Sequence, residues 1–390
     1  MNSKEIMELY DEHVINVYNQ IPIVLDKGHG AVLYDVDGNR YIDFFSGVAV
    51  NNVGQTCDRV VEAIKNQASK MIHCSNIYYN EPAAVLAEKL TRLSGFDKVF
   101  FSNSGAEANE CAIKLVRKYS DKHEIIATNN SFHGRTMLTL TMTGNEKYKN
   151  QFKPLPSGFK HVNFGDIDEL KESITEDTSA IVLELIQGES GVKVASQEYF
   201  DEVQSICDEN DILLVIDEVQ TGFGRTGELF AFNLFNLKPD IVTLAKGLGG
   251  GVPIGATLTT NQIASCFSLG DHGSTFGGNP LAAAAANATL DVLVEENLCE
   301  NSKKMGDYFK KELLKLKSKY SQIIDVRGYG LMIGVELDYN ASIIVDGMLT
   351  KGFLINSTGN NVLRLVPPSI ITKTQIDDFI KALDEIFLKL

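Results

Sequence analysis

The sequence predicts an α/β protein with a large, doubly wound and mostly parallel sheet and a smaller α+β part. From Lys98 to Leu244, short apolar runs alternate with longer segments of helical periodicity, which is typical of parallel strands joined by helices. Two of the runs are followed by a charged residue, Asp217 and Lys246. Ligands of such sheets bind beyond the carboxyl ends of the strands, so these two residues mark the expected site.

The first elements surround the expected sheet. An amphipathic helix is expected over residues 4–17, followed by a hairpin (31–34 with 41–44) around Asp37-Gly38-Asn39. Helices follow over 59–69 and 81–93, the second with Asn80 as its N-cap and Pro82 in its first turn.

The sheet itself is expected to consist of buried parallel strands at 99–101, 125–127, 181–183, 213–216 and 241–244. Helices over 106–119, 166–174 and 197–209 connect them. After Pro280 a long helix, broken near Glu300, runs to about residue 317, and strands at 332–337 and 362–366 precede a last helix at 374–390. We therefore expect a large α/β domain over 60–280 and a small α+β domain formed by 1–59 and 281–390.

The composition excludes several classes of function. A net charge of −15 argues against binding to nucleic acid or to an anionic membrane. The longest apolar stretch, 281–290, is too short to span a bilayer, and the first five residues do not resemble a secretory signal. The six cysteines have neither CxxC spacing nor a neighbouring His pair, which favours reduced thiols over disulfides or a metal site. We expect a cytoplasmic protein without a metal ion.

Asp217 and Lys246 carry the chemical prediction. A buried carboxylate at a strand end is costly unless it is paired, and a pyridinium N–H is a fitting partner. A lysine in an apolar, glycine-rich pocket has a lowered pKa and can attach to a carbonyl. Together they match pyridoxal phosphate (PLP) chemistry. Val219 could pack beneath the ring and Gln220 could bond its phenolic oxygen. The alternatives are an Asp that caps a helix and a solvated loop lysine.

Two loops at other strand ends add weaker signals. Ser104, Gly105 and Ala106 follow one strand and open a helix, so free backbone N–H groups there could bind a phosphate; a plain tight turn is the alternative. In the loop 131–136, Phe132 could stack on a flat cofactor and Arg135 could bind a carboxylate. A core phenylalanine and a surface arginine are the alternative there.

One stretch imitates a dinucleotide site. Gly222-Phe223-Gly224-Arg225-Thr226-Gly227 fits the pattern G-x-G-x-x-G and follows a strand. The residues after it are too few and too aromatic for the required long helix, and no acidic residue ends a following strand. An NAD-dependent oxidoreductase therefore stays a remote alternative.

Taken together, these motifs resemble the class III PLP-dependent aminotransferases of fold type I, and most closely their acetylornithine branch, over nearly the whole chain. The stretches that carry the resemblance are 46–52, 75–82, the loop at Ser104, 131–136, 217–220, 244–247, 272–280 and 364–368.

The resemblance implies a role for each site residue. Lys246 would bind the coenzyme covalently and shuttle the proton, and Asp217 would pair with the ring nitrogen. Phe132 would stack on the ring, and Gly105 with Ala106 would bind the phosphate. Thr275 would reach the phosphate of a neighbouring subunit, which implies a homodimer with shared sites.

The substrate side follows from the same resemblance. Arg135 and Ser274 would contact substrate, and Arg364 would take the α-carboxylate of glutamate. Glu189 would cover Arg364 for the amine donor and release it for 2-oxoglutarate. The chain departs from the family pattern at Leu185 and Ser190 beside this glutamate, and at residues 55–58.

The implied reaction moves the terminal amino group of N-acetylornithine to 2-oxoglutarate, giving N-acetylglutamate semialdehyde and glutamate in arginine biosynthesis. Val48 leaves an apolar space for an acetyl group where ornithine aminotransferases tend to carry tyrosine. One such contact discriminates by only about 1–3 kcal/mol, so ornithine, succinylornithine and 4-aminobutyrate stay open as donors.

Overall fold

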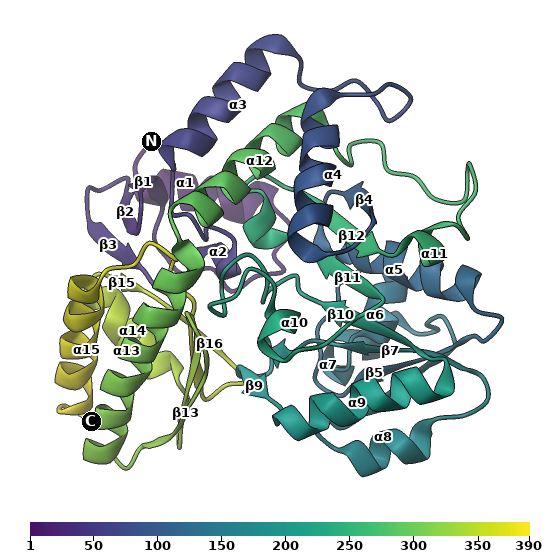
Figure 1. Cartoon of the computed structure of the whole chain (residues 1–390). Helices are drawn as coiled ribbons and strands as arrows, with labels where there is room; N and C mark the ends of the chain where they lie inside the picture. Colours follow the sequence, from purple (N-terminus) through teal and green to yellow (C-terminus); the bar gives the residue numbers. More distant parts are fainter.

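The computed structural model describes all 390 residues and is built around a seven-stranded sheet. Its strand order is β4-β12-β11-β10-β7-β5-β6 (Figure 1). The bounds in that order are Lys98–Ser102, Gly255–Thr259, Ile241–Leu244, Leu213–Asp217, Thr178–Leu183, Glu124–Thr128 and Phe159–Val162. β12 is antiparallel to both of its neighbours, and the other pairs are parallel. The predicted large, mostly parallel sheet is confirmed.

The sequence prediction missed β6 and β12 and misjudged β4. β6 places a lysine and a histidine in an edge strand, and β12 alternates small and polar residues although all five are buried. Neither forms the apolar run on which the prediction relied. The strand at 99–101 was expected to be a buried parallel strand, but β4 is only half-buried and pairs solely with the antiparallel β12.

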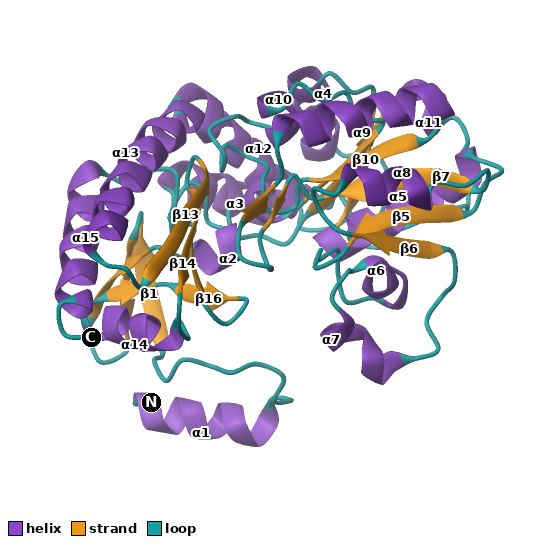
Figure 2. Cartoon of the chain, turned by 90° about the horizontal axis from the view of Figure 1, so that it is seen from below, coloured by secondary structure: helices purple, strands orange, loops and turns teal.

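Helices cover both faces of this sheet (Figure 2). One hydrophobic cluster joins α5 (Gly105–Tyr119) to Ile125, Ala127 and Val215. A larger cluster lies on the opposite face, where Ile126, Ile216 and their neighbours contact α4 (Glu81–Ser94), α9 (Gln197–Asn210) and α12 (Pro280–Glu295). Because adjacent strand residues belong to different clusters, the sheet is buried on both sides, as in a doubly wound fold.

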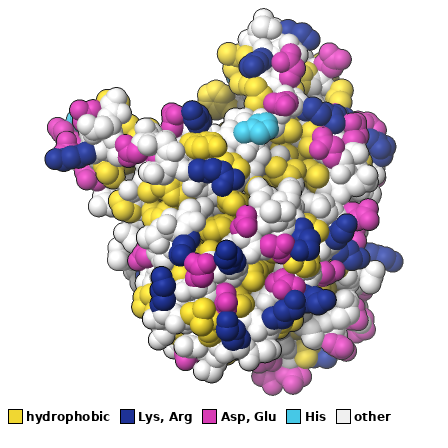
Figure 3. Space-filling model, turned by 90° about the vertical axis from the view of Figure 1, so that its left-hand side faces the viewer, with side chains coloured by type: hydrophobic (Ala, Val, Ile, Leu, Met, Phe, Trp, Pro, Cys, Tyr) yellow, Lys and Arg dark blue, Asp and Glu magenta, His cyan; other side chains and the backbone are white.

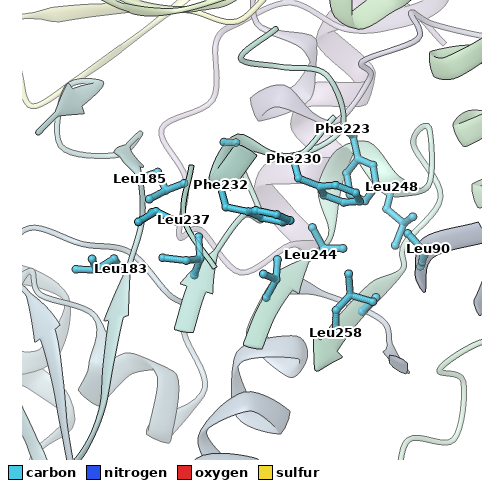
Figure 4. Close-up of a cluster of buried hydrophobic side chains, with 14 of the residues drawn as sticks. Leu90, Leu183, Leu185, Phe223, Phe230, Phe232, Leu237, Leu244, Leu248 and Leu258 are labelled. Atoms are coloured by element: carbon cyan, nitrogen blue, oxygen red, sulfur yellow. The ribbon is translucent and has the colours of Figure 1, made fainter. Parts of the chain in front are cut away.

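Figure 4 shows part of the larger cluster. Leu183, Leu185 and Leu237 lie on one side of it, beside the rings of Phe230 and Phe232. These two rings stack with centroids 5.6 Å apart and planes 11° apart. The side chain at position 185, one of the departures from the family pattern, is thus core packing rather than part of a ligand surface.

Both chain termini contribute to two smaller sheets. β1-β2-β3-β15 joins the N-terminal hairpin to Phe353–Leu354, and β13-β14-β17-β16 lies beside it. The bounds of the other strands are Leu25–His29, Val32–Asp35 and Arg40–Asp43 for β1 to β3, and Ile323–Tyr329, Met332–Leu337, Asn356–Thr358 and Val362–Leu365 for β13, β14, β16 and β17. The predicted hairpin is confirmed by the antiparallel pairing of β2 with β3.

A separate hydrophobic cluster holds these sheets to α13 (Leu298–Lys319), α14 (Ser342–Thr350) and α15 (Lys373–Phe387). Phe44 lies at its centre, with ring centroids 4.3 to 5.9 Å from those of Phe309, Phe353 and Phe379. The larger cluster of the seven-stranded sheet also contains Val53, residues of α12 and Leu298, so α12 packs with the large sheet. The division into 60–280 and the two terminal segments stays a prediction from the sequence.

Two helix predictions need correction. The first helix ends at His13 rather than at residue 17, and α1 (Ser3–His13) stands apart from the rest of the chain with no buried residue (Figure 2). The break after Pro280 falls at Glu296–Asn297 rather than near Glu300, because Asn297 adopts a left-handed conformation (φ 53°) between α12 and α13.

The remaining elements are short, except for one. α3 (Asp58–Lys70) corresponds to the helix predicted over 59–69. It packs on α12. The others are α2 (Ser46–Ala49), α6 (Met137–Met142), α7 (Glu146–Lys149), α8 (Ile167–Ser173), α10 (Ala231–Leu234), α11 (Asn261–Ala264), the 3₁₀ turns at Asn150–Phe152 and Lys246–Leu248, and strands β8 (Ile186–Gln187) and β9 (Lys193–Val194). No helix is long and apolar enough to cross a membrane.

One buried arginine ties the large sheet to the terminal segments. The side chain of Arg225 is fully buried and donates hydrogen bonds to the carbonyl oxygens of Leu331 and Pro367 and to Asn52. Burial lowers its pKa to about 9. The segment that imitates a dinucleotide motif is thus a buried turn, and the helix after it, α10, has only four residues.

Candidate active site

A cavity of about 470 Å³ opens at the carboxyl ends of the central strands. This volume lies within the range of about 300–1,000 Å³ that is usual for small-molecule sites. Its lining includes these predicted site residues: Ser104, Gly105, Ala106, Phe132, Arg135, Asp217, Val219, Gln220 and Lys246. These residues come from four separate parts of the sequence and meet in one place.

Parallel pairing of β10 with β11 brings the acid and the amine together. Asp217 is the last residue of β10 and lies opposite Thr243 of β11, three residues before Lys246. Both strands therefore deliver their charged residue at the same edge of the sheet. Lys246 adopts a positive φ of 40°, which a non-glycine residue keeps only when its surroundings hold it there.

The carboxylate of Asp217 is oriented by a buried network. Its Oδ2 accepts a hydrogen bond from Asn109 Nδ2 at 2.8 Å and lies 2.8 Å from His133 Nδ1, while its Oδ1 accepts from the backbone N–H of Val219 at 3.0 Å. Asn109 is itself fixed, because its Oδ1 accepts from Thr243 Oγ1. Only 4% of Asp217 is exposed, so the negative charge depends on these partners.

Neighbouring ionisable groups adjust to this charge. Burial lowers the pKa of His133, but the hydrogen bond and the charge of Asp217 outweigh it and leave the pKa above its ordinary value. Burial raises the pKa of Glu184 to about 7 despite the nearby His133. Glu184 lines the cavity and accepts a hydrogen bond from the backbone N–H of Phe132 at 2.8 Å.

Lys246 is a ready nucleophile in this setting. Burial and the charge of Arg364 lower its pKa to about 8, against the smaller opposing effects of Glu189, Asp217 and Glu184. An ordinary lysine has a pKa of 10.5, so the neutral amine is available much closer to neutral pH.

The N-terminus of α5 forms another wall. Ser104 is the N-cap and accepts from the backbone N–H of Glu107 through its side chain. A Cβ on Gly105 would lie 2.7 Å from two carbons of Val219, so only glycine fits between them. Backbone N–H groups at the start of this 15-residue helix are accessible from the cavity, which suits a phosphate.

The predicted gate residues form an ion pair beside the cavity. Arg364 Nη1 lies 2.5 Å from Glu189 Oε1 and 3.4 Å from Gln220 Oε1. Burial raises the pKa of Glu189, but the charge and hydrogen bond of Arg364 outweigh it and lower the pKa. Arg364 is buried and Glu189 half-buried, so the carboxylate rather than the guanidinium meets solvent.

Five predicted site residues do not line the cavity: Glu189 and Arg364, which adjoin it through Gln220, and Val48, Thr275 and Ser274. Val48 belongs to a left-handed turn with a φ of 66°, and Val50 lines the wall in its place. Thr275 is exposed and faces solvent. Ser274 reaches the cavity only through Asn103: its Oγ accepts a hydrogen bond from the side chain of Asn103, which lines the cavity. Residues 55–57 precede α3 and Asp58 is its first residue, and none of these four residues lines the cavity.

Sequence reasoning missed three functional candidates. Asn109 falls in the helix expected over 106–119 and His133 in the loop 131–136, and neither is assigned a role from the sequence, although both hold Asp217. Glu184 is assigned no role from the sequence, although it follows the buried strand β7 as Asp217 ends β10. The strand-end argument that identified Asp217 applies equally to Glu184 and could have found it.

Comparison with known proteins agrees with this geometry. Residues 14–387 match the family described as aminotransferase class-III. The chain belongs to the class III aminotransferases. The acetylornithine aminotransferase of Methanocaldococcus jannaschii is 51% identical over 100% of both chains, and that of Methanothermobacter thermautotrophicus is 50% identical over 99% of both.

Solved structures of this family have the same fold. The ornithine aminotransferase of Toxoplasma gondii ME49 aligns with a TM-score of 0.96 at 32% identity, covering 100% of this chain and 96% of that one. The acetylornithine aminotransferase of Elizabethkingia anophelis aligns with a TM-score of 0.90 at 35% identity over 100% of both chains. The predicted fold class and aminotransferase activity are thereby confirmed, and the oxidoreductase alternative is set aside.

Class III aminotransferases use PLP, and the cavity fits this coenzyme. A buried carboxylate faces it, an amine of lowered pKa lies beside that carboxylate, and a helix N-terminus provides the place for a phosphate. Gly105 lets Val219 pack directly against the start of α5, so both residues lie together in the cavity wall.

The amine of Lys246 is expected to react as a nucleophile at a pH well below the pH at which an ordinary lysine does so. Because its pKa is about 8, the neutral fraction rises through pH 8 rather than through pH 10.5. The measurement is the rate at which coenzyme-free enzyme regains its visible absorption band after addition of PLP at a series of pH values. A rate that rises only near pH 10.5 would contradict this assignment.

Proposed function

We propose that the protein transfers the terminal amino group of N-acetylornithine to 2-oxoglutarate, giving N-acetylglutamate semialdehyde and glutamate in arginine biosynthesis. The observation that carries this proposal is the Glu189–Arg364 pair at the edge of the coenzyme cavity. Full-length relatives at 51% and 50% identity with the name acetylornithine aminotransferase support the choice of donor.

In this proposal the coenzyme is held from three sides. Asp217 would pair with the protonated ring nitrogen, because a buried carboxylate favours a cationic partner. Asn109 and His133 fix the direction of its oxygens. Ser104, Gly105 and Ala106 would hold the phosphate, and Phe132 and Val219, which also line the cavity, would hold the ring. When bound, PLP supplies the electron-withdrawing ring that lets an amino group and a proton be exchanged between carbon skeletons.

Lys246 then serves as the proton carrier. With a pKa of about 8, its amine accepts a proton from the substrate carbon and returns it without a large energetic penalty in either direction. The positive φ at Lys246 and the buried residues on either side restrict where its side chain can point.

The ion pair of Glu189 and Arg364 explains how one pocket accepts two unlike substrates. The donor carries no carboxylate beside its reacting amine, so Glu189 neutralises the guanidinium during that half-reaction. 2-Oxoglutarate carries a carboxylate beside its keto carbon, and this carboxylate replaces Glu189 on Arg364. Arg135 takes the distant carboxylate at the cavity mouth, with Ser274 nearby.

Ornithine is the second candidate donor, because solved ornithine aminotransferases share the fold at TM-scores of up to 0.96. Succinylornithine and 4-aminobutyrate remain further alternatives. The apolar side chain of Val50 in the cavity wall favours an acetylated donor over one with a free α-amino group. A contribution of Val48 stays a prediction from the sequence.

We also propose that two copies of the chain share their sites. Large apolar side chains are exposed in several segments: Ile15, Val17 and Tyr18; Ile77, Tyr78 and Tyr79; and Leu269 with Phe276. Hydrophobic side chains are also visible on the face in Figure 3. Phe276 follows Thr275, the residue expected to reach a neighbouring phosphate. A cytoplasmic location stays a prediction from the sequence.

The donor assignment is tested by the visible spectrum of the purified enzyme. N-Acetylornithine is expected to abolish the coenzyme band at least ~10 times more efficiently than ornithine or 4-aminobutyrate, since one apolar contact discriminates by about 1–3 kcal/mol. Single-turnover rates over a range of donor concentrations give the comparison. A higher efficiency with ornithine would reassign the enzyme to the second candidate.

The substitution Glu189→Gln is expected to weaken the N-acetylornithine half-reaction by about 10-fold or more, because it leaves the guanidinium of Arg364 without its neutralising charge. The glutamate half-reaction should change much less. Glu336→Gln provides the matched control, since Glu336 also pairs with an arginine at 2.5 Å, and this arginine, Arg327, hydrogen-bonds to no residue that lines the coenzyme cavity. Equal losses in both half-reactions would contradict the gate.

Sedimentation equilibrium tests the shared-site dimer. We expect a species of twice the chain mass of 42.9 kDa. Replacing Tyr79 by Asp should shift the population towards the monomer and weaken PLP retention together, because the side chain of Tyr79 is fully exposed in the single chain. A stable monomer that retains PLP would refute shared sites.

A further inference from the structure

The side chain of Arg135, which is expected to recognise substrate, is held by no polar contact within the chain. It is exposed at the mouth of the cavity and makes no hydrogen bond or ion pair with any residue of the chain. An unpaired arginine side chain has many rotamers, and fixing it on a ligand costs conformational entropy. A contact other than a hydrogen bond or an ion pair must therefore hold the guanidinium of Arg135 if it is to bind a carboxylate in a defined direction.

The ring of Tyr148 provides that support. The central carbon of the Arg135 guanidinium lies 3.7 Å from the centroid of the Tyr148 ring, and 5.5 Å from that of Phe132. The two rings meet edge to face at an angle of 90°, with centroids 6.0 Å apart. Tyr148 thus contacts both the guanidinium of Arg135 and the ring of Phe132, which lines the coenzyme cavity.

Stacking leaves the binding edge of the guanidinium free. The N–H groups of arginine lie in the plane of the group, and a ring against its face does not compete for them. A carboxylate can then be bound through two parallel hydrogen bonds in that plane. A lysine or an unsupported arginine would not offer this fixed orientation.

The position of Tyr148 is itself fixed. It lies in the short helix α7 (Figure 2), whose next residue, Lys149, is buried and pairs with Glu146 at 2.8 Å. The backbone N–H of Tyr148 donates to Asn145, whose side chain caps the helix. The Tyr148 hydroxyl has no hydrogen-bond partner in the chain, so its ring is the part that acts.

We infer that Tyr148 is a positioning residue that sets the affinity for substrates with a carboxylate distant from the reacting carbon, by holding the guanidinium of Arg135. This deepens the proposed function and rests on it for the identity of the donor and for the role of Arg135. Tyr148 neither touches the coenzyme cavity nor supplies a proton.

The test compares Tyr148→Leu with Tyr148→Phe in the PLP-loaded enzyme. The leucine variant should raise KM for the best carboxylate-bearing donor by about 3- to 30-fold, the range expected for loss of a cation–π contact. Its kcat should stay near the wild-type value. The phenylalanine variant keeps the ring and should restore most of the wild-type KM. Tyr148→Met replaces leucine if that variant does not retain the coenzyme band.

A double-mutant cycle with Arg135→Met separates positioning from general damage. If the ring acts through the guanidinium, adding Tyr148→Leu to Arg135→Met should raise KM no further. If the two substitutions raise KM additively, the inference is overturned. It is also overturned if the leucine and phenylalanine variants both have the KM of the wild type. A wild type that uses ornithine instead of N-acetylornithine would refute the donor assignment alone, because the same cycle can be run with ornithine.

Discussion

Hydrogen bonding between the parallel strands β10 and β11 is the constraint on which the rest of the site depends. It sets the register that puts Asp217 and Lys246 at the same edge of the sheet. A buried charge is costly without a partner, and Asn109, His133 and the backbone N–H of Val219 provide partners for Asp217. The shared position of Asp217 and Lys246 makes a cavity between them useful to a ligand that carries an N–H at one side and a carbonyl at the other.

The surrounding charges form a graded arrangement. On one side, His133 and Asn109 stabilise the negative charge of Asp217. On the other side, Arg364 disfavours the protonated form of Lys246, and Glu189 moderates that effect. Glu184 lies between the two sides with a pKa of about 7, so its charge responds to small changes in its neighbours. The site therefore contains two groups, Glu184 and Lys246, whose pKa values of about 7 and about 8 lie near neutral pH.

The sequence was sufficient for the large sheet and for most of the cavity floor. Strand runs such as 213–216 are apolar throughout, and residues such as Asp217 and Gly105 stand at the ends of such runs, where topology brings them together. β12 escaped prediction because its burial comes from small and polar residues, which leave no apolar run. The contacts of Arg135 with Tyr148 could not be predicted, because no periodicity relates a loop to a four-residue helix 13 positions later.

The floor and the mouth of the cavity are built from different kinds of structure. The floor consists of strand ends and the N-terminus of α5, all held by the packed sheet. The mouth, with Arg135 and the ring that supports it, consists of a loop and a single helical turn. Gene duplicates of such a protein can diverge towards new amines by altering a few residues at the rim, while the coenzyme chemistry beneath is inherited intact.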